Sequence, residues 1–372
     1  MTRCIIHIGM HRTGSTSIQE SLQGLSDSQF LYAKLGDNPN HSLATYSMFA
    51  PQPERHHLHR RNGADAAAVS DYIARMRADL EQAVSAAQGR MLVISGEDIN
   101  AIPPDGLLKF RDYFQQRFED IAVVGYVRSP GGYMSSVFQH RVRMGAVDRF
   151  DLEAQYRSYK ATFGKFDEVF GRERVRLLKF DVGAFPGGCA VQDFCARLDI
   201  HLPSEKIVRL NESLPREIIA LMYSYCRVGP NGASSLMGPE RETLLNRLAP
   251  VGNNPFRISA NVIKPILEAN RADIAWMEAR LGQTLHDDFG KHQAGDVLDE
   301  SDLFHPDPEV TGKLLALLGG TAPTGVKGET PEEVARLVHA LRETGVQQRN
   351  NLRAINSYLG KRVTALLQYF FR

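Results

Sequence analysis

A loop rich in glycine and hydroxyl residues, residues 9–17, lies where a short apolar run meets a helical pattern. Its sequence is Gly-Met-His-Arg-Thr-Gly-Ser-Thr-Ser. Backbone N–H groups of such a loop, together with the positive end of the following helix, form a cradle for a phosphate-like anion. Arg12 adds a planar cation that can bind two oxygens of one anion. The alternative is a tight turn in which Thr13 or Ser15 only caps the helix.

The spacing of Gly9 and Gly14 matches the loop GxxxxGK[ST], which binds nucleoside triphosphates. Ser15, however, stands where that loop has the lysine that reaches the terminal phosphates. A clear carboxylate for magnesium after a buried strand is also missing from the pattern. A P-loop kinase is therefore disfavoured, although an anion site is retained.

A second candidate anion site begins at Arg128, directly after an apolar run that ends at Val127. Pro130 suits the first position of a helix, and Ser136 follows eight residues after the arginine. The pair could hold a second phosphate, which suggests a doubly phosphorylated ligand. The alternative is an arginine paired with a carboxylate and a serine that is simply solvated.

The elements that must position these residues alternate between strand and helix. Apolar, β-branched runs predict buried strands at 3–8, 91–95, 121–127 and 175–180. Helical spacing of apolar residues predicts helices at 16–25, 65–88 and 103–118. This alternation predicts an α/β fold with a parallel sheet flanked by helices, and ligands bound beyond the carboxyl ends of the strands.

Other parts of the chain show weaker patterns. Residues 31–63 are polar and lack a sustained period, so they are expected to form a long surface loop inserted in a nucleotide-binding core of residues 1–228. Within that loop, the His- and Arg-rich stretch 54–61 indicates a basic surface rather than a metal site. Helical patterns dominate residues 229–372, which are expected to form an extension covering the acceptor cleft.

Composition excludes several classes of function. There are 44 Lys and Arg against 43 Asp and Glu, so no net field attracts nucleic acid. No apolar run approaches the roughly 18 residues needed to cross a bilayer, and a cytoplasmic protein is expected. The four cysteines are too sparse for a disulfide framework and are expected to be reduced and mostly buried.

Taken together, the two motifs resemble those of the sulfotransferases that use 3'-phosphoadenosine 5'-phosphosulfate (PAPS), of the bacterial or carbohydrate type. The loop at 9–17 is similar to the family's 5'-phosphosulfate loop, and Arg128 with Ser136 is similar to its 3'-phosphate motif. A later stretch also fits the family's order and adds Arg209, Asn211 and Ser213 as nucleotide ligands. The resemblance covers roughly residues 1–226 and implies the P-loop-like sulfotransferase fold.

The resemblance implies a reaction: in-line transfer of the sulfuryl group of PAPS to an acceptor hydroxyl or amine, with release of adenosine 3',5'-bisphosphate (PAP). Arg12 would stabilise charge on the leaving phosphate, Arg128 and Ser136 would hold the 3'-phosphate, and no metal would be required. Backbone and hydroxyl groups of the loop would bind the nucleotide; these residues are Thr13, Gly14, Ser15, Thr16 and Ser17. Two positions depart from the family: Arg12 replaces a lysine, and Ser129 replaces an acidic or amide residue.

A general base must take the proton of the acceptor. Glu97 follows the buried run 91–95 at the ligand-bearing edge, and several carbohydrate sulfotransferases place a glutamate there, which favours a sugar hydroxyl as the acceptor. His11 and His140 are the reserve candidates. The alternative for Glu97 is a helix-capping or ion-pairing carboxylate, and the alternative for the chain is a catalytically silent nucleotide- or glycan-binding protein on the same fold.

Overall fold

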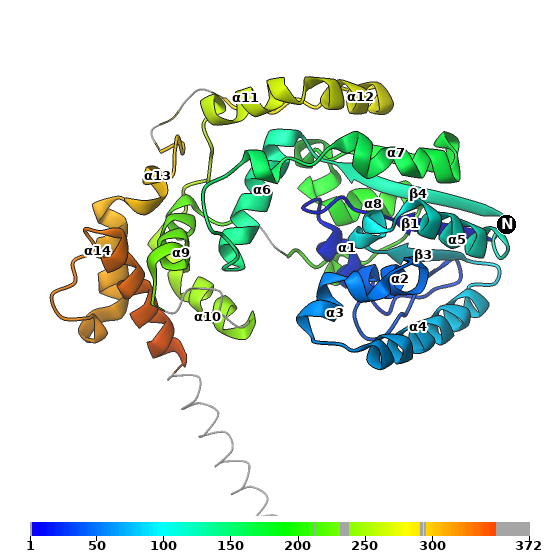
Figure 1. Ribbon diagram of the computed structural model, residues 1–372, viewed down its shortest axis with the longest axis horizontal. Helices are drawn as coiled ribbons and strands as arrows, with labels where there is room; N and C mark the ends of the chain where they lie inside the picture. The colour runs from blue at the N-terminus through cyan, green and yellow to red at the C-terminus, as the bar shows by residue number, and fades with distance from the viewer. Residues whose placement is uncertain (1, 211–212, 231–237, 291–292, 294, 347–372) are drawn as a thin grey trace, which may run out of the picture. The chain divides into compact units, whose positions relative to one another are not determined.

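The computed structural model describes residues 2–210, 213–230, 238–290, 293 and 295–346. Its centre is one sheet of five parallel strands in the order β2-β3-β1-β4-β5, flanked by helices (Figure 1). The strands are β1 (Arg3–His7), β2 (Phe30–Tyr32), β3 (Met91–Ser95), β4 (Asp120–Val127) and β5 (Val175–Lys179). The predicted α/β class with a parallel sheet is therefore confirmed, as are the four predicted strands.

The central strand β1 lies between β3 and β4, with Ile5 in register with Val93 on one side and Ala122 on the other. All three residues are buried, as expected for a strand covered on both faces. The chain first builds β2 and β3 on one side of β1 and then crosses to β4 on the other. Such a reversal of strand order opens a crevice beyond the carboxyl ends of the central strands.

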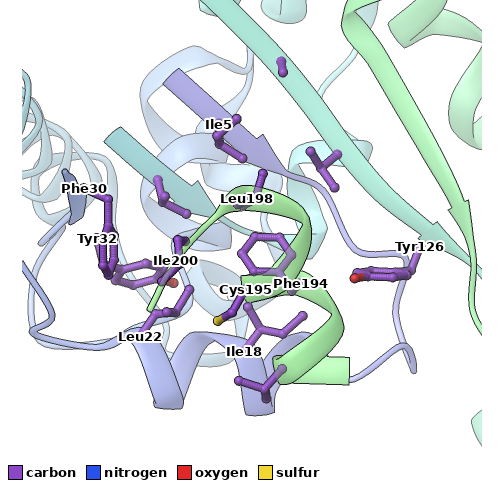
Figure 2. Packing of buried hydrophobic residues seen from close by; sticks show 14 of the residues in the cluster. Ile5, Ile18, Leu22, Phe30, Tyr32, Tyr126, Phe194, Cys195, Leu198 and Ile200 are labelled. Atoms are coloured by element: carbon purple, nitrogen blue, oxygen red, sulfur yellow. The ribbon is translucent and has the colours of Figure 1, made fainter. Parts of the chain in front are cut away.

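One face of the sheet packs against helices α1 (Ser15–Leu22) and α8 (Ala190–Leu198). Figure 2 shows Ile5 and Tyr126 from the strands in one buried cluster with Ile18 and Phe194 from the two helices. This packing fixes the start of α1, and thus the loop before it, against the end of β1.

The chain divides into two compact units. The first holds the sheet and comprises residues 1–133, 156–212 and 267–288. Its remaining helices are α2 (Ser42–Phe49), α3 (His57–Arg61), α4 (Ala66–Ala86), α5 (Pro104–Gln115), α7 (Tyr159–Phe170) and α12 (Arg271–Leu281). Short 3-10 turns join them, among which η2 (Glu97–Ala101) follows β3.

The second unit comprises residues 134–155, 213–266 and 289–372 and is helical in its described part. Phe138 there stacks on Phe256 with ring centroids 5.9 Å apart, and Tyr223 packs edge-on against Phe304. Its helices are α9 (Arg216–Val228), α10 (Gly238–Leu248), α13 (Ser301–Phe304), α14 (Pro308–Leu318) and a helix over 331–346. Two helices belong partly to each unit: α6 (Pro130–Arg143) and α11 (Ala260–Ala269). The expected division of the chain at residue 228, with 229–372 over an acceptor cleft, stays a prediction.

The expectation of a long surface loop at 31–63 is wrong. This segment contains β2, α2 and α3, and much of α2 is buried. The buried side chains of α2 include Ser42, Thr45 and Ser47 as well as apolar ones. Because small polar residues occupy core positions and the elements are only three to eight residues long, no hydrophobic period is visible.

Two further expectations concern the whole chain. The four cysteines are free thiols, three of them buried and one partly buried. Within the described ranges, no helix is both long and apolar enough to cross a membrane. The expected cytoplasmic location is a separate prediction.

Candidate functional site

The carboxyl ends of the strands bring the predicted residues of the first unit to one edge of the sheet. The loop at 9–17 follows β1, Glu97 follows β3, and Arg128 follows β4. Because β1 pairs directly with both β3 and β4, these three strand ends are neighbours. Residues more than a hundred positions apart in the chain thus meet at the place where a parallel sheet binds its ligands.

The loop after β1 is held in a defined conformation. Gly9 and Gly14 have φ of 83° and 77°, and Arg12 adopts the left-handed region with φ of 66°. A Cβ atom on Gly14 would lie 2.8 Å from the Cβ of Ala190, so the contact between α1 and α8 requires glycine there. The hydroxyl groups of Thr13 and Ser15 both donate to the carbonyl of Met10, at 2.6 and 3.3 Å. Their side chains stabilise the loop, while their backbone groups stay candidates for anion binding.

Ser17 has a structural role that the sequence did not indicate. Its hydroxyl accepts a hydrogen bond from the backbone N–H of Leu210 at 3.0 Å and lies 3.4 Å from that residue's carbonyl oxygen. Ser21, one turn later in α1, accepts from the N–H of Val208 at 2.8 Å. These bonds bring the exposed Arg209 alongside α1, close in space to the loop that the resemblance pairs it with.

For three other predicted nucleotide ligands, the structure does not define a position relative to the loop. Ser136 is buried on α6, about two turns after its start, and belongs to the second unit, as does the exposed Ser213. Asn211 lies outside the described residues. Their roles in nucleotide binding stay predictions.

The two predicted anion-binding arginines lie together. Nη1 of Arg128 donates to the backbone carbonyl of Arg12 at 2.8 Å. Burial and, to a smaller extent, the positive charge of Arg12 lower the pKa of Arg128 to about 10, while Asp287 acts in the opposite direction. A buried guanidinium beside another cation favours the binding of an anion.

Glu97 lies against the anion loop. A Cβ atom on Gly9 would come within 3.1 Å of its Cγ, and its Oε2 accepts a hydrogen bond from Asn40 at 3.3 Å. Burial raises the pKa of Glu97 above its ordinary value, although the neighbouring His11 acts in the opposite direction. A carboxylate with a raised pKa beside an anion site has the properties of a general base.

The neighbouring Asp98 is the centre of a hydrogen-bonded chain that sequence reasoning missed. Nη1 of Arg157 contacts Nδ1 of His11 at 3.1 Å, and the arginine can only donate. The proton of His11 is therefore on Nε2, which lies 3.2 Å from Oδ1 of Asp98 and donates to it. On the other side, the backbone N–H of Leu58 donates to Nδ1 of His56, so Nε2 of His56 donates to Oδ2 of Asp98 at 3.1 Å.

This hydrogen-bonded chain explains why the pKa of Asp98 is lowered. Burial alone would raise the pKa of Asp98, but the hydrogen bonds that His11 and His56 donate hold it well below the ordinary value. The carboxylate is therefore ionised, and it fixes one tautomer of His11. Both ring nitrogens of His11 are engaged, which weighs against this residue as a free base and favours Glu97.

Three residues at the same place carry atoms that could bind a metal. His56 Nε2, His57 Nδ1 and a carboxylate oxygen of Asp98 lie within 4.8 Å of one another. In the hydrogen-bonded chain, however, Nε2 of His56 carries a proton and has no lone pair for a metal. The three residues are better described as a carboxylate with neighbouring histidines than as the ligand set of a metal, and the expectation that no metal is required stays a prediction.

The expected basic surface at 54–61 is wrong for two of its histidines. His56 and His59 are buried, with His59 Nε2 at 2.8 Å from the hydroxyl of Ser47. The sequence signal for the Asp98 chain is limited to the pair of acidic residues directly after β3. Its histidines come from segments of irregular spacing, which only the fold brings together.

Asp287 caps the helix that follows Arg128. Its two carboxylate oxygens accept from the backbone N–H groups of Gly131 and Gly132 at 2.7 and 2.8 Å. A carboxylate at the positive end of a helix satisfies donors that have no partner within the helix. This contact fastens the segment after α12 beside the strand end that carries Arg128.

We expect Asp287→Ala to lower the free energy of unfolding by about 1 kcal/mol, the usual cost of losing a helix cap. Asp287→Asn, which keeps one acceptor oxygen, should lose less. Urea denaturation followed by circular dichroism measures both. Equal stability of Asp287→Ala and the wild type would show that the cap contributes nothing.

Comparisons with known proteins give weak similarities. No protein-family model matches the chain, and no curated protein matches its sequence. Among solved structures, a sulfotransferase from Alicyclobacillus acidocaldarius is similar, with a TM-score of 0.39 and 14% identity over 76% of this chain and 96% of that one. A sulfotransferase domain from the curacin biosynthetic pathway has a TM-score of 0.32 and 17% identity over 63% of this chain and 83% of that one. The function is therefore inferred from the residues of this chain.

Proposed function

We propose that this protein is a sulfotransferase that moves the sulfuryl group of PAPS to a hydroxyl group of a carbohydrate-type acceptor. The donor is a substrate with two separate anionic ends, a 3'-phosphate and a 5'-phosphosulfate. The proposal therefore requires two cationic positions within reach of one nucleotide, and a base beside one of them.

The observation that carries the proposal is the meeting of Arg12 and Arg128. The contact between the Arg128 guanidinium and the Arg12 carbonyl spans 116 positions of sequence, and the charge of Arg12 lowers the pKa of Arg128. Two cations this close repel each other in the free protein. A dianionic or trianionic ligand would relieve the repulsion.

The residues at the edge of the sheet account for each part of the reaction. Arg12 and the backbone N–H groups of the loop would stabilise negative charge on the departing 5'-phosphate. Glu97 would take the proton of the acceptor hydroxyl as the acceptor oxygen bonds to sulfur and the bridging S–O bond breaks. The products are a sulfate ester, protonated Glu97 and PAP. Most of the catalytic effect would come from positioning and charge stabilisation, as in phosphoryl transfer.

The acceptor is assigned less directly than the donor. A glutamate at this strand end, with a raised pKa and contact with the anion loop, supports a carbohydrate hydroxyl, since the resemblance associates that base with sugar acceptors. A sugar-containing acceptor and a small nucleotide donor are thus the two ligands of the proposal, and no metal takes part in it.

Isothermal titration tests the donor. We expect the full chain to bind PAP at least about a hundredfold more tightly than ATP with magnesium, because the 3'-phosphate would contact Arg128 whereas the site lacks the lysine of an ATP loop. A preference for ATP with magnesium would instead support a kinase. Binding of neither nucleotide would contradict the proposal.

A further inference from the structure

Arg157 ends the hydrogen-bonded chain that passes through Asp98, and its position is fixed from both sides. Its guanidinium donates to His11, which is part of the anion loop. Two residues later, the hydroxyl of Tyr159 donates to the backbone carbonyl of Arg128 at 2.6 Å. The arginine is thereby held between the loop after β1 and the end of β4.

The backbone that carries Arg157 is also anchored. The carboxylate of Asp273 accepts from the hydroxyl of Ser158 at 2.8 Å and from the backbone N–H of Tyr159 at 2.7 Å. Ser158 itself caps α7, since its hydroxyl accepts from the N–H of Ala161. An arginine held by a capped helix start and a fixed imidazole loses little conformational entropy when it binds a ligand.

The charge of Arg157 lacks a close anionic partner within the described part of the chain, where no carboxylate oxygen lies within 4.0 Å of its nitrogens. Its neighbours respond to the uncompensated charge. The pKa of Lys165 is lowered to about 8 by burial and by Arg157. Burial raises the pKa of Tyr133, whereas the charges of Arg157 and Arg12 lower it. The charge of Glu97 raises it again, so all three residues act on the same phenol. Arg157 therefore faces the same space as the proposed donor ligand and the proposed base.

We propose that Arg157 is a further catalytic residue, which binds the sulfuryl group of the donor between Arg12 and Glu97. The inference rests on the proposed function. During transfer, the sulfur passes from the bridging oxygen to the acceptor oxygen, and its three other oxygens carry negative charge throughout. The fork of N–H groups on Arg157 would bind these oxygens, while Asp98 and His11 act as positioning residues. The guanidinium keeps its protons, since the acceptor proton goes to Glu97.

The comparison of PAPS with PAP tests this contact, because the two nucleotides differ only by the sulfuryl group. In titrations without acceptor, Arg157→Gln should weaken PAPS binding by about tenfold to a hundredfold, the effect of losing a hydrogen bond to a charged group, and leave PAP binding nearly unchanged. Arg157→Lys, which keeps the charge but loses the planar fork, should give a smaller shift in the same direction. If the glutamine variant does not fold, the lysine variant provides the test.

Arg149→Gln is the matched control, since this exposed arginine pairs with Asp151 at 2.6 Å and belongs to the second unit. It should leave the ratio of the PAPS and PAP dissociation constants unchanged. An unchanged ratio in Arg157→Gln or Arg157→Lys would overturn the assignment, and so would an equal loss of affinity for both nucleotides, which would indicate a contact with another part of the ligand. Failure of the wild type to bind either nucleotide would overturn the proposed function itself and this inference with it.

Discussion

Glu97→Gln should lose between about a hundredfold and ten-thousandfold in turnover, the usual contribution of a general base, while binding PAP with unchanged affinity. The glutamine can still accept the hydrogen bond that Asn40 donates to the wild-type side chain. It cannot take a proton from an acceptor hydroxyl. The measurement is release of PAP from PAPS with a sugar that the wild type sulfates, chosen from a panel of mono- and oligosaccharides.

The pH dependence of the wild type follows from the raised pKa of Glu97. A base acts in its deprotonated form, so the rate should fall as the pH decreases through its pKa. Because burial raises that pKa, the acid limb of the profile should lie above the range of an ordinary glutamate. The limb should be absent from the residual rate of Glu97→Gln.

The same substitution should stabilise the free protein at neutral pH. A carboxyl whose folded pKa lies above its unfolded value contributes stability at low pH, and this contribution is lost as the pH rises through the folded pKa. Removing the charge therefore favours folding at neutral pH, and the difference from the wild type should vanish as the pH decreases. Melting temperatures across a pH series measure this effect.

The exposed Glu54 provides the control for both effects. Glu54→Gln should change neither turnover nor the pH dependence of the melting temperature. Full turnover in Glu97→Gln would eliminate Glu97 as the base. Loss of turnover together with loss of PAP binding would mean that the side chain supports the loop rather than the chemistry.

The sequence predicted the sheet and its ligand-bearing edge because those features depend on local patterns. Runs such as 91–95 are mainly apolar and include β-branched residues, and the glycines of the loop at 9–17 mark a change from strand to helix. The edge follows from the rule that parallel strands end on the same side. The meeting of Arg12 with Arg128 could therefore be expected before any coordinates.

The series of hydrogen bonds that runs from Arg157 through His11 and Asp98 to His56 could not be predicted in the same way. Its hydrogen bonds join residues that are between 2 and 146 positions apart in the sequence. One of the donors is the backbone N–H group of Leu58, and another is the guanidinium of Arg157. Neither His11 nor His56 lies at helical spacing from another residue of this series of hydrogen bonds. The short helices at 42–61 that carry part of this chain bury serine and threonine, so their pattern is polar although their positions are internal.

Arg128→Gln should weaken PAP binding by at least about a hundredfold, since a bidentate contact between a guanidinium and a phosphate includes two charge-assisted hydrogen bonds. Glutamine keeps a donor for the Arg12 carbonyl, so the loop should stay folded. Turnover at saturating PAPS should fall less than affinity, because the 3'-phosphate is remote from the bond that breaks. Titration and saturation kinetics on the same preparation separate the two effects.

The comparison of PAP with adenosine 5'-phosphate, which lacks the 3'-phosphate, shows whether the arginine contacts that group. The wild type should prefer PAP, and Arg128→Gln should lose most of this preference while binding adenosine 5'-phosphate about as well as the wild type does. If the variant instead lost affinity for both nucleotides in equal measure, Arg128 would be acting through the conformation of Arg12, whose carbonyl it contacts. The ratio of the two affinities therefore distinguishes a phosphate ligand from a support of the loop, which the loss of PAP binding alone would leave unresolved.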